Sequence, residues 1–173
     1  MRTLTNDFLN VSNSFAAKVV FLVPTTTLAP QQLKACIQTG MMSPAEAASL
    51  TGQLGQSKRE NVWKDKRAIF ITAQTLCNDI EKSIVRAGDI RCIVIDEAHQ
   101  ARGEHAYVQA VRLVLSATKY CRVLALSATP GADFVHTQNL IAHLRISRLE
   151  VRHDGDEDVA PYVRQKLTEL KRV

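Results

Sequence analysis

The chain has 173 residues, which is about one domain and enough to bury a single hydrophobic core. Its 22 basic and 17 acidic residues give a formal net charge of +5, compatible with a polyanionic partner and equally with a solvated basic surface. No apolar run approaches the ~18 residues that span a bilayer, and the N-terminus lacks the pattern of a secretory signal. We therefore expect a soluble intracellular protein without a membrane partner.

Four cysteines are scattered along the chain, and no two of them have the C-x-x-C spacing of a metal or redox motif. Three of them, Cys77, Cys92 and Cys121, lie in or beside apolar segments. We interpret them, together with Cys36, as reduced core residues of an intracellular protein.

The first half of the chain alternates strand and helix patterns. Its first apolar run is closed by Pro24, which cannot donate to a strand ladder. Further on, Leu76, Ile80 and Ile84 recur every four residues, which is typical of a helix with one apolar face. The elements expected here are, in chain order, a strand over 18–25, a helix over 27–39, a short helical piece over 57–64, a strand over 67–72 and a helix over 75–87.

The second half continues the alternation. Tyr107, Ala110, Val111, Val114 and Leu115 have the spacing of the apolar face of a helix. The elements expected here are, in chain order, a strand over 92–95, a helix over 104–118, a strand over 121–126, a helix over 133–144 and a strand over 146–152.

This order of elements indicates the fold class. Strands that alternate with helices favour right-handed crossovers, which give a parallel sheet with helices on both faces, so we expect an α/β fold. The acidic run 154–158 is predicted to be a surface loop, and 162–172 a charged helix that leads out of the domain.

Two carboxylates, Asp96 and Glu97, follow the buried strand Cys92 to Ile95. Ligands bind at the carboxyl ends of the strands in open parallel sheets. The pattern is that of a Walker B motif, in which one carboxylate holds magnesium through water and the next orients or deprotonates the attacking water. Taken alone, the same pattern is more often just a strand that meets a polar turn.

Three more strand ends are polar, and the carboxyl ends of parallel strands share one edge of the sheet. We therefore expect the four ends to lie together there: Pro24–Thr25, Thr72–Gln74, Asp96–His99 and Ser127–Thr129. In this order and spacing the stretches Pro-Thr, Thr-x-Gln-x-Leu, Asp-Glu-Ala-His and Ser-Ala-Thr resemble the first motor domain of superfamily 2 helicases, which has a RecA-like P-loop NTPase fold.

More specifically, the chain resembles the Fanconi anaemia group M and archaeal Hef family of fork-remodelling DNA translocases. The resemblance runs from about Lys18 to Tyr162. The stretches that carry it are Lys18–Thr25 with Gln31–Gln32, Leu50–Gly52, Trp63 with Lys66–Arg67, Gln74 with Asn78–Asp79, Cys92–His99, Leu124–Gly131, Leu149–Arg152 and Pro161–Tyr162.

The resemblance implies a role for each matched residue. Asp96 would bind magnesium, Glu97 would be the catalytic carboxylate, and His99 would couple the ATP site to the second motor domain. Ser127 and Thr129, with Ala128 between them, would link hydrolysis to movement on DNA. The residues expected to contact the phosphate backbone of DNA, without reading bases, are Pro24, Thr25, Thr51, Gly52, Thr72 and Gln74.

Plainer interpretations remain open for the same residues. His99 could be a satisfied polar residue at a helix start. Ser127 and Thr129 could cap the turn or the helix that follows, and the threonines from Thr25 onward could be an N-cap cluster. The basic residues around Trp63 could be a solvated face rather than a DNA contact.

One part of the motor pattern is missing. The sequence has no Gly-x-x-x-x-Gly-Lys loop to hold phosphates, and the segment from Gly52 to Lys58 has the wrong spacing. By resemblance the loop lies upstream of Lys18, so we expect a fold truncated at the N-terminus. The expected division is a remnant of the helix after the loop over 1–17, a partial motor domain over 18–153, and an acidic loop with a charged helix over 154–173. Ala73 and Thr27 replace prolines that are usual in the family.

The resemblance implies part of an ATP-dependent DNA helicase or translocase of the nucleus, acting with magnesium on branched or fork DNA in repair. A second motor domain of a longer chain would complete the ATP site. Two alternatives stay open: a DNA-binding or scaffold module without turnover, and an RNA helicase of the Dicer and antiviral-sensor branch.

Overall fold

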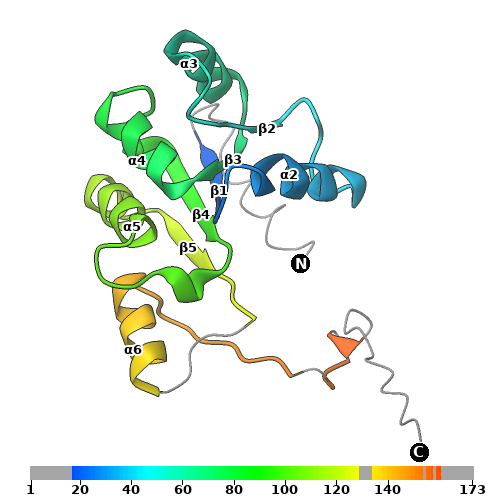
Figure 1. Ribbon diagram of the computed structural model, residues 1–173, viewed down its shortest axis with the longest axis vertical. Coiled ribbons are helices and arrows are strands. Elements are labelled where there is room, and N and C mark those ends of the chain that lie inside the picture. The colour runs from blue at the N-terminus through cyan, green and yellow to red at the C-terminus, as the bar shows by residue number, and fades with distance from the viewer. Residues whose placement is uncertain (1–16, 129–133, 154, 158, 161–173) are drawn as a thin grey trace, which may run out of the picture.

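The computed structural model describes residues 17–128, 134–153, 155–157, 159 and 160, and its centre is a parallel sheet (Figure 1). The sheet has five strands in the order β2-β3-β1-β4-β5, and every neighbouring pair is parallel. The strands are β1 (Lys18–Val23), β2 (Ala47–Ser49), β3 (Ala68–Thr72), β4 (Ile90–Ile95) and β5 (Arg122–Ala125).

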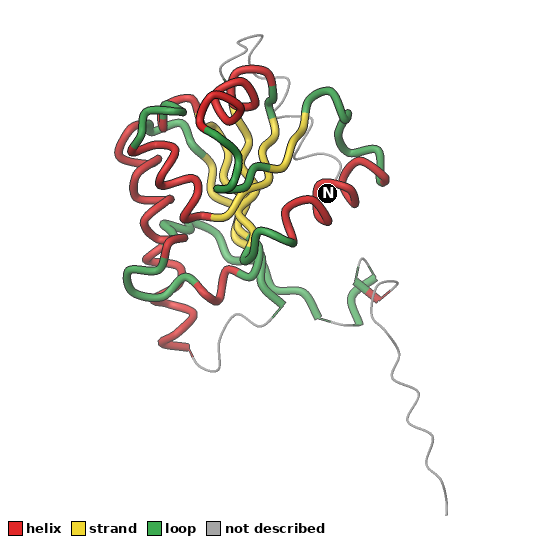
Figure 2. The backbone as a smooth tube through the Cα atoms, turned by 45° about the horizontal axis from the view of Figure 1, so that its top comes forward, coloured by secondary structure: helices red, strands yellow, loops and turns green. Residues whose placement is uncertain are grey.

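Helices connect the strands and cover the sheet on both sides (Figure 2). They are the α-helices α2 (Leu28–Gln38), α3 (Gln56–Asp65), α4 (Ala73–Glu81), α5 (Ala106–Ala117) and α6 (Phe134–His143), and the short 3-10 helices η1 (Ala87–Asp89) and η2 (Ala98–Gln100). None of the helices among the described residues combines the length and apolar character needed to cross a bilayer.

The two sides of the sheet have separate cores because strand side chains alternate between faces. On one side Val23 and Phe70 pack with Ala29 of α2. On the other side Leu22 and Ile93 belong to a larger cluster formed with α3, α4 and α5. The expected α/β fold with a helix-covered parallel sheet is confirmed.

The helix expected over 75–87 ends earlier, at Glu81. Ser83 has a φ of 56°, and the backbone N–H of Ile84 donates to the carbonyl of Asp79 at 2.8 Å. The N–H of Ser83 donates to Ile80 at 3.0 Å, which completes a Schellman motif. Ile84 is still buried, although the helix has already ended.

The prediction of a strand over 146–152 is wrong. The segment has no strand conformation, and its apolar residues Leu149 and Val151 are 56% and 58% exposed. Among the described residues β5 pairs only with β4, so the expected strand does not extend the sheet at β5. Conversely, β2 was not expected, since three small residues carry no readable alternation.

Parts of the expected domain division lie outside the described residues. They are the helix remnant up to residue 16, the charged helix over 162–172, and residues 154 and 158 of the acidic loop. Residues 155–157, within the loop, form turns and a bend.

Candidate functional site

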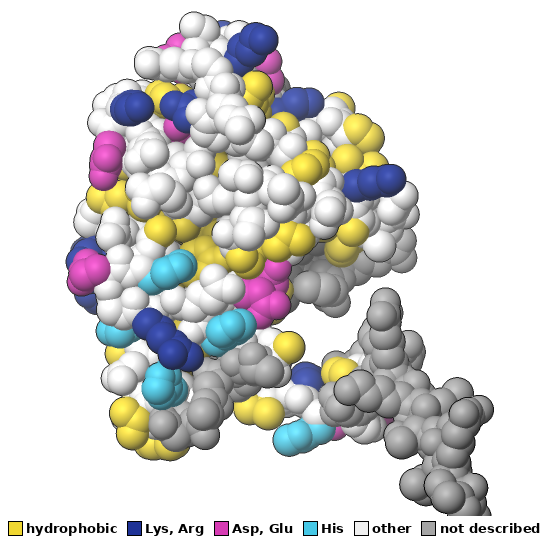
Figure 3. Space-filling model, viewed as in Figure 1, with side chains coloured by type: hydrophobic (Ala, Val, Ile, Leu, Met, Phe, Trp, Pro, Cys, Tyr) yellow, Lys and Arg dark blue, Asp and Glu magenta, His cyan; other side chains and the backbone are white. Residues whose placement is uncertain are grey.

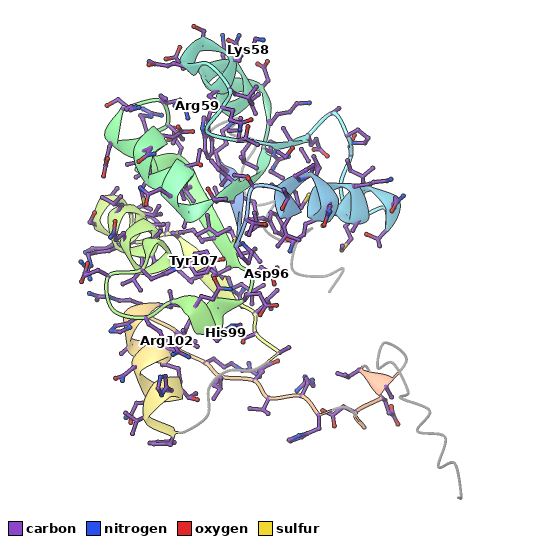
Figure 4. The ribbon with its side chains drawn as sticks, viewed as in Figure 1. Lys58, Arg59, Asp96, His99, Arg102 and Tyr107 are labelled. Atoms are coloured by element: carbon purple, nitrogen blue, oxygen red, sulfur yellow. The ribbon has the colours of Figure 1, made fainter. Side chains whose placement is uncertain are left out.

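The polar strand ends predicted to lie together do so. In the strand register Val23 of β1 stands opposite Thr72 of β3, and Leu22 stands opposite Ile95 of β4. Ile95 in turn stands opposite Ala125 of β5. The residues that follow these positions therefore leave the sheet along one edge, where Figure 4 shows Asp96 and His99.

Asp96 is held in place by two hydrogen bonds to its carboxylate. Its Oδ1 accepts from the backbone N–H of Glu97 at 3.0 Å, and its Oδ2 accepts from the side-chain amide of Gln32 on α2. The backbone N–H of Asp96 donates to Leu22 at 3.0 Å, which continues the sheet by one residue. The carboxylate is thus anchored from the strand below and from the helix beside it.

Gln32 was not assigned a role from the sequence. It belongs to the stretch Gln31–Gln32 that carries the family resemblance, but the sequence alone does not say which glutamine faces the sheet edge. The apolar spacing of α2 was the only signal available, and a polar residue in the middle of a helix does not indicate a partner 64 residues further along the chain.

The backbone of the chain changes direction at Glu97, directly after the end of β4. Its φ of 50° places it in the left-handed region, which costs a residue other than glycine of the order of 1–3 kcal/mol. In this conformation Glu97 Oε2 lies 3.2 Å from Nδ1 of His99, and the Glu97 side chain is 43% exposed. Figure 3 shows acidic side chains and a histidine side by side on this face.

His99 also contacts the neighbouring strand end. Its Nδ1 lies 3.1 Å from the hydroxyl of Ser127, which follows β5. With the proton on Nδ1 the imidazole donates to Glu97, and with the proton on Nε2 the Ser127 hydroxyl donates to Nδ1. His99 therefore joins β4 to β5 through a contact that depends on its tautomer.

The other expected coupling residues are only partly described. Ala128 follows Ser127 and is exposed, and Thr129 lies outside the described residues. Whether these residues link hydrolysis to movement stays a prediction.

Two of the expected DNA contacts follow β1. Pro24 is half-buried and Thr25 is exposed. The hydroxyls of Thr25 and Thr27 are 3.0 Å apart, and the carbonyl of Thr25 accepts from Leu28 at 3.2 Å, so this turn leads directly into α2. Thr27 makes no side-chain capping bond to α2, which disfavours the N-cap interpretation for that residue.

The remaining four expected DNA contacts lie around the start of α4. Thr72 caps this helix by accepting from the N–H of Thr75, and their hydroxyls are 2.9 Å apart. A Cβ on Gly52 would meet the Thr75 hydroxyl at 3.7 Å, so the loop that carries Thr51 and Gly52 packs against the same helix start. Gln74 is exposed and donates to Asn78 at 3.1 Å.

A buried tyrosine lies below the acidic pair. Tyr107 of α5 is 1% exposed, and its hydroxyl has no hydrogen-bond partner among the described residues. Burial raises the pKa of Tyr107, and the charges of Asp96 and Glu97 raise the pKa further. The hydroxyl therefore stays neutral and does not add a third negative charge to the site.

The donor set at the sheet edge fits magnesium held through water. Magnesium keeps several waters and takes one or two carboxylates together with substrate phosphates. Asp96 supplies such a carboxylate, and no group of three or more metal-binding side chains occurs in the part of the chain that the structure describes. The remaining ligands would therefore be water and the phosphates of ATP.

The chain matches one family model and several known proteins. The model described as "Type III restriction enzyme, res subunit" matches residues 2–132. The Fanconi anemia group M protein homolog of Mus musculus is 38% identical over 154 residues, which cover 89% of this chain and 8% of that protein. The putative ATP-dependent DNA helicase fml2 of Schizosaccharomyces pombe is 40% identical over 91% of this chain and 20% of its own length.

Solved structures agree with these relatives. The Pyrococcus furiosus Hef helicase domain has a TM-score of 0.76 and 32% identity, and the match covers 85% of this chain and 31% of that one. A DEAD box protein from Methanococcus jannaschii, with a TM-score of 0.60 and 20% identity, shares the fold. The described residues therefore have a RecA-like helicase fold, and the chain spans only 8% to 20% of the two curated relatives.

Proposed function

The chain belongs to the Type III restriction enzyme res subunit family and to the Fanconi anaemia group M and Hef family of superfamily 2 helicases, and from this premise we propose that it is part of the first motor domain of an ATP-dependent DNA helicase or translocase. Its substrate would be branched or fork DNA during repair, in the nucleus. A second motor domain of the longer protein would complete the ATP site.

The observation that carries this proposal is the contact network of Asp96, Glu97, His99 and Ser127 across two strand ends. Asp96, fixed by Gln32, would hold magnesium through water. Bound magnesium would neutralise charge that develops on the transferred phosphoryl group. Glu97 would accept a proton from the attacking water. Because His99 contacts both Glu97 and Ser127, a change in the charge of Glu97 would alter the contact between His99 and Ser127.

DNA would lie across the loops that follow β1, β2 and β3. The exposed hydroxyl of Thr25, the Thr51–Gly52 loop and the amino-terminal end of α4 at Thr72–Gln74 offer hydroxyls and amides that suit phosphates. Such contacts carry no base information, which suits a motor that moves over any sequence.

The test is ATP hydrolysis by the complete protein with different nucleic acids. We expect fork DNA to stimulate hydrolysis more than duplex RNA of the same length at equal ionic strength, since both present phosphates but differ in helix geometry. Stimulation by duplex RNA alone would contradict the proposal and favour an RNA motor.

A second candidate function rests on the sequence itself. These 173 residues contain no Gly-x-x-x-x-Gly-Lys loop, so the chain by itself is also a candidate for DNA binding without turnover. Hydrolysis of magnesium-ATP by the complete protein separates the two. The first candidate predicts turnover that DNA stimulates, and DNA binding without measurable turnover would favour the second.

A further inference from the structure

A buried carboxylate far from the ATP site joins two helices. Asp79 of α4 is 0% exposed, and it contacts two residues of α3. The indole N–H of Trp63 donates to Asp79 Oδ2 at 2.8 Å. A guanidinium nitrogen of Arg59 lies 3.1 Å from Asp79 Oδ1. Figure 4 shows Arg59 on α3 beside α4.

These contacts are buried attachments of α3 to the domain, and a further one is the Lys18 ammonium, which donates to the carbonyl of Lys64 at 3.4 Å. Arg59 and Trp63 are the buried residues of α3, Val62 is half-buried, and every other residue of the helix is exposed. Apart from Trp63 and Val62, which pack in the core, the helix offers little apolar surface. Its position therefore depends on few side chains, and two of them reach Asp79.

The cluster is not arranged for maximum stability. Nε of Arg59 is buried and has no hydrogen-bond partner among the described residues. Burial raises the pKa of Asp79, while the hydrogen bond from Trp63 and the charge of Arg59 lower it only in part. A buried ion pair with incomplete hydrogen bonding often adds no more stability than apolar residues of the same size. Its specific geometry therefore suggests a role in positioning.

Of the two helices that meet at Asp79, α4 begins at an expected DNA contact and α3 begins a few residues after one. The loop of Thr51 and Gly52 leads into α3, and Thr72 to Gln74 open α4. The loop is anchored on its other side by the backbone bond from Leu50 to Phe70 at 2.8 Å. The angle and distance between α3 and α4 therefore contribute to the spacing between the two polar segments, together with the direct approach of Gly52 to Thr75.

We propose that Asp79, through Trp63 and Arg59, is a positioning residue for the DNA strand, because it fixes the Thr51–Gly52 loop relative to the start of α4. This inference rests on the proposed function. Asp79 touches neither DNA nor ATP and acts through the helices that it joins.

The test uses Asp79→Asn and Arg59→Met in the complete protein. Asp79→Asn keeps an acceptor for Trp63 and removes the charge that faces Arg59, and Arg59→Met keeps an apolar stem. The matched control is Asp89→Asn, which makes the same change of charge in an ion pair with Arg86 at 2.9 Å. Asp89 directly precedes β4 and Asp96 directly follows it, so the two residues lie at opposite ends of the same strand.

The readout is DNA-stimulated ATP hydrolysis at increasing concentrations of fork DNA. For both variants we expect the half-saturating DNA concentration to rise about tenfold, since small displacements of positioned groups weaken several contacts at once. The rate at saturating DNA is expected to stay within about twofold of wild type. Asp89→Asn should change neither value, and Arg59→Lys, which keeps the charge, should restore much of the affinity.

Each other outcome overturns the inference in a recognisable way. An unchanged half-saturating concentration in both variants would show that Asp79 does not position the DNA contacts. A lower saturating rate with unchanged DNA affinity would show a loss of folded protein and a merely structural role. A wild-type protein that DNA does not stimulate would overturn the proposed function, and the inference with it.

Discussion

At the scale of single residues, the strand ends are the most informative part of the chain. Asp96, Glu97, His99 and Ser127 were expected at one edge, and the structure brings them into contact. The prediction was possible because the carboxyl ends of parallel strands share an edge whatever the loops do. The contact of Gln32 with Asp96 was not predictable, since it depends on the rotation of α2 about its axis.

Ser127→Ala tests the link between the two strand ends. The substitution removes the hydroxyl that faces His99 but keeps the contact between His99 and Glu97. We expect DNA stimulation of ATP hydrolysis in the complete protein to fall about tenfold while hydrolysis without DNA is unchanged. Equal loss of both rates, measured in a phosphate-release assay, would contradict a coupling role.

Thr72→Ala tests the cap of α4. Thr72 is the N-cap residue, and its loss is expected to lower the free energy of unfolding of the chain by about 1 kcal/mol. Thr72→Ser keeps the oxygen and should stay close to wild type. Urea unfolding followed by circular dichroism measures both, and a loss for Ser equal to that for Ala would rule out capping as the cause.

At the scale of elements, the sequence predicted which helices and strands exist, and their order, better than it predicted where they end. Apolar periodicity located α5 correctly. For α4 it predicted an end several residues too late, because Ile84 keeps the apolar spacing after the helix has ended. The end is fixed by the backbone of Ser83, which lies in the left-handed region. A serine gives no sequence signal for this conformation, whereas a glycine would have done so.

Ser83→Gly is therefore expected to stabilise the chain. Glycine adopts a φ of 56° without the steric cost that serine has there, so the free energy of unfolding should rise by about 0.5–1 kcal/mol. Ser116→Gly is the control, because Ser116 lies exposed within α5, where glycine should destabilise by a similar amount. If both substitutions destabilise, the left-handed conformation of Ser83 is not the cause that ends α4.

At the scale of the whole molecule, the sequence predicted a helix-covered parallel sheet, but it missed the edge strand β2 and placed over 146–152 a strand that does not form. The buried strands β1, β3 and β4 are continuous apolar runs, so they were readable. The strand β2 and the segment 146–152 were not, because pairing at a sheet edge depends on neighbours rather than on local pattern.

The four cysteines test the packing of the folded chain. All are free thiols, and burial raises the pKa of Cys77 and of Cys92 from 9.0 to about 11. We expect alkylation at pH 8 to modify the half-exposed Cys36 first and to reach Cys77 and Cys92 only after denaturation. Mass spectrometry of partly labelled protein identifies the order, and early labelling of Cys92 would contradict the buried position of β4.

The same thiols determine in which direction the free energy of unfolding changes at alkaline pH. Their pKa values are higher in the folded chain than the ordinary value of 9.0, so the folded state binds more protons than the unfolded state at alkaline pH. The free energy of unfolding should therefore be unaffected below pH 9.0 and fall as the pH rises from there to about 11. Replacement of Cys77 by Ala should make this fall smaller.

The measurement that tests the central claim most directly is ATP hydrolysis by the complete protein carrying Glu97→Gln, with fork DNA present. The proposed motor loses its catalytic carboxylate, so hydrolysis should fall at least about 100-fold, while the affinity for fork DNA stays unchanged. Glu104→Gln serves as the control, because it removes the same charge. Glu104 lies in the loop before α5, and its side chain is 72% exposed. Hydrolysis by Glu97→Gln close to the wild-type rate would contradict the account.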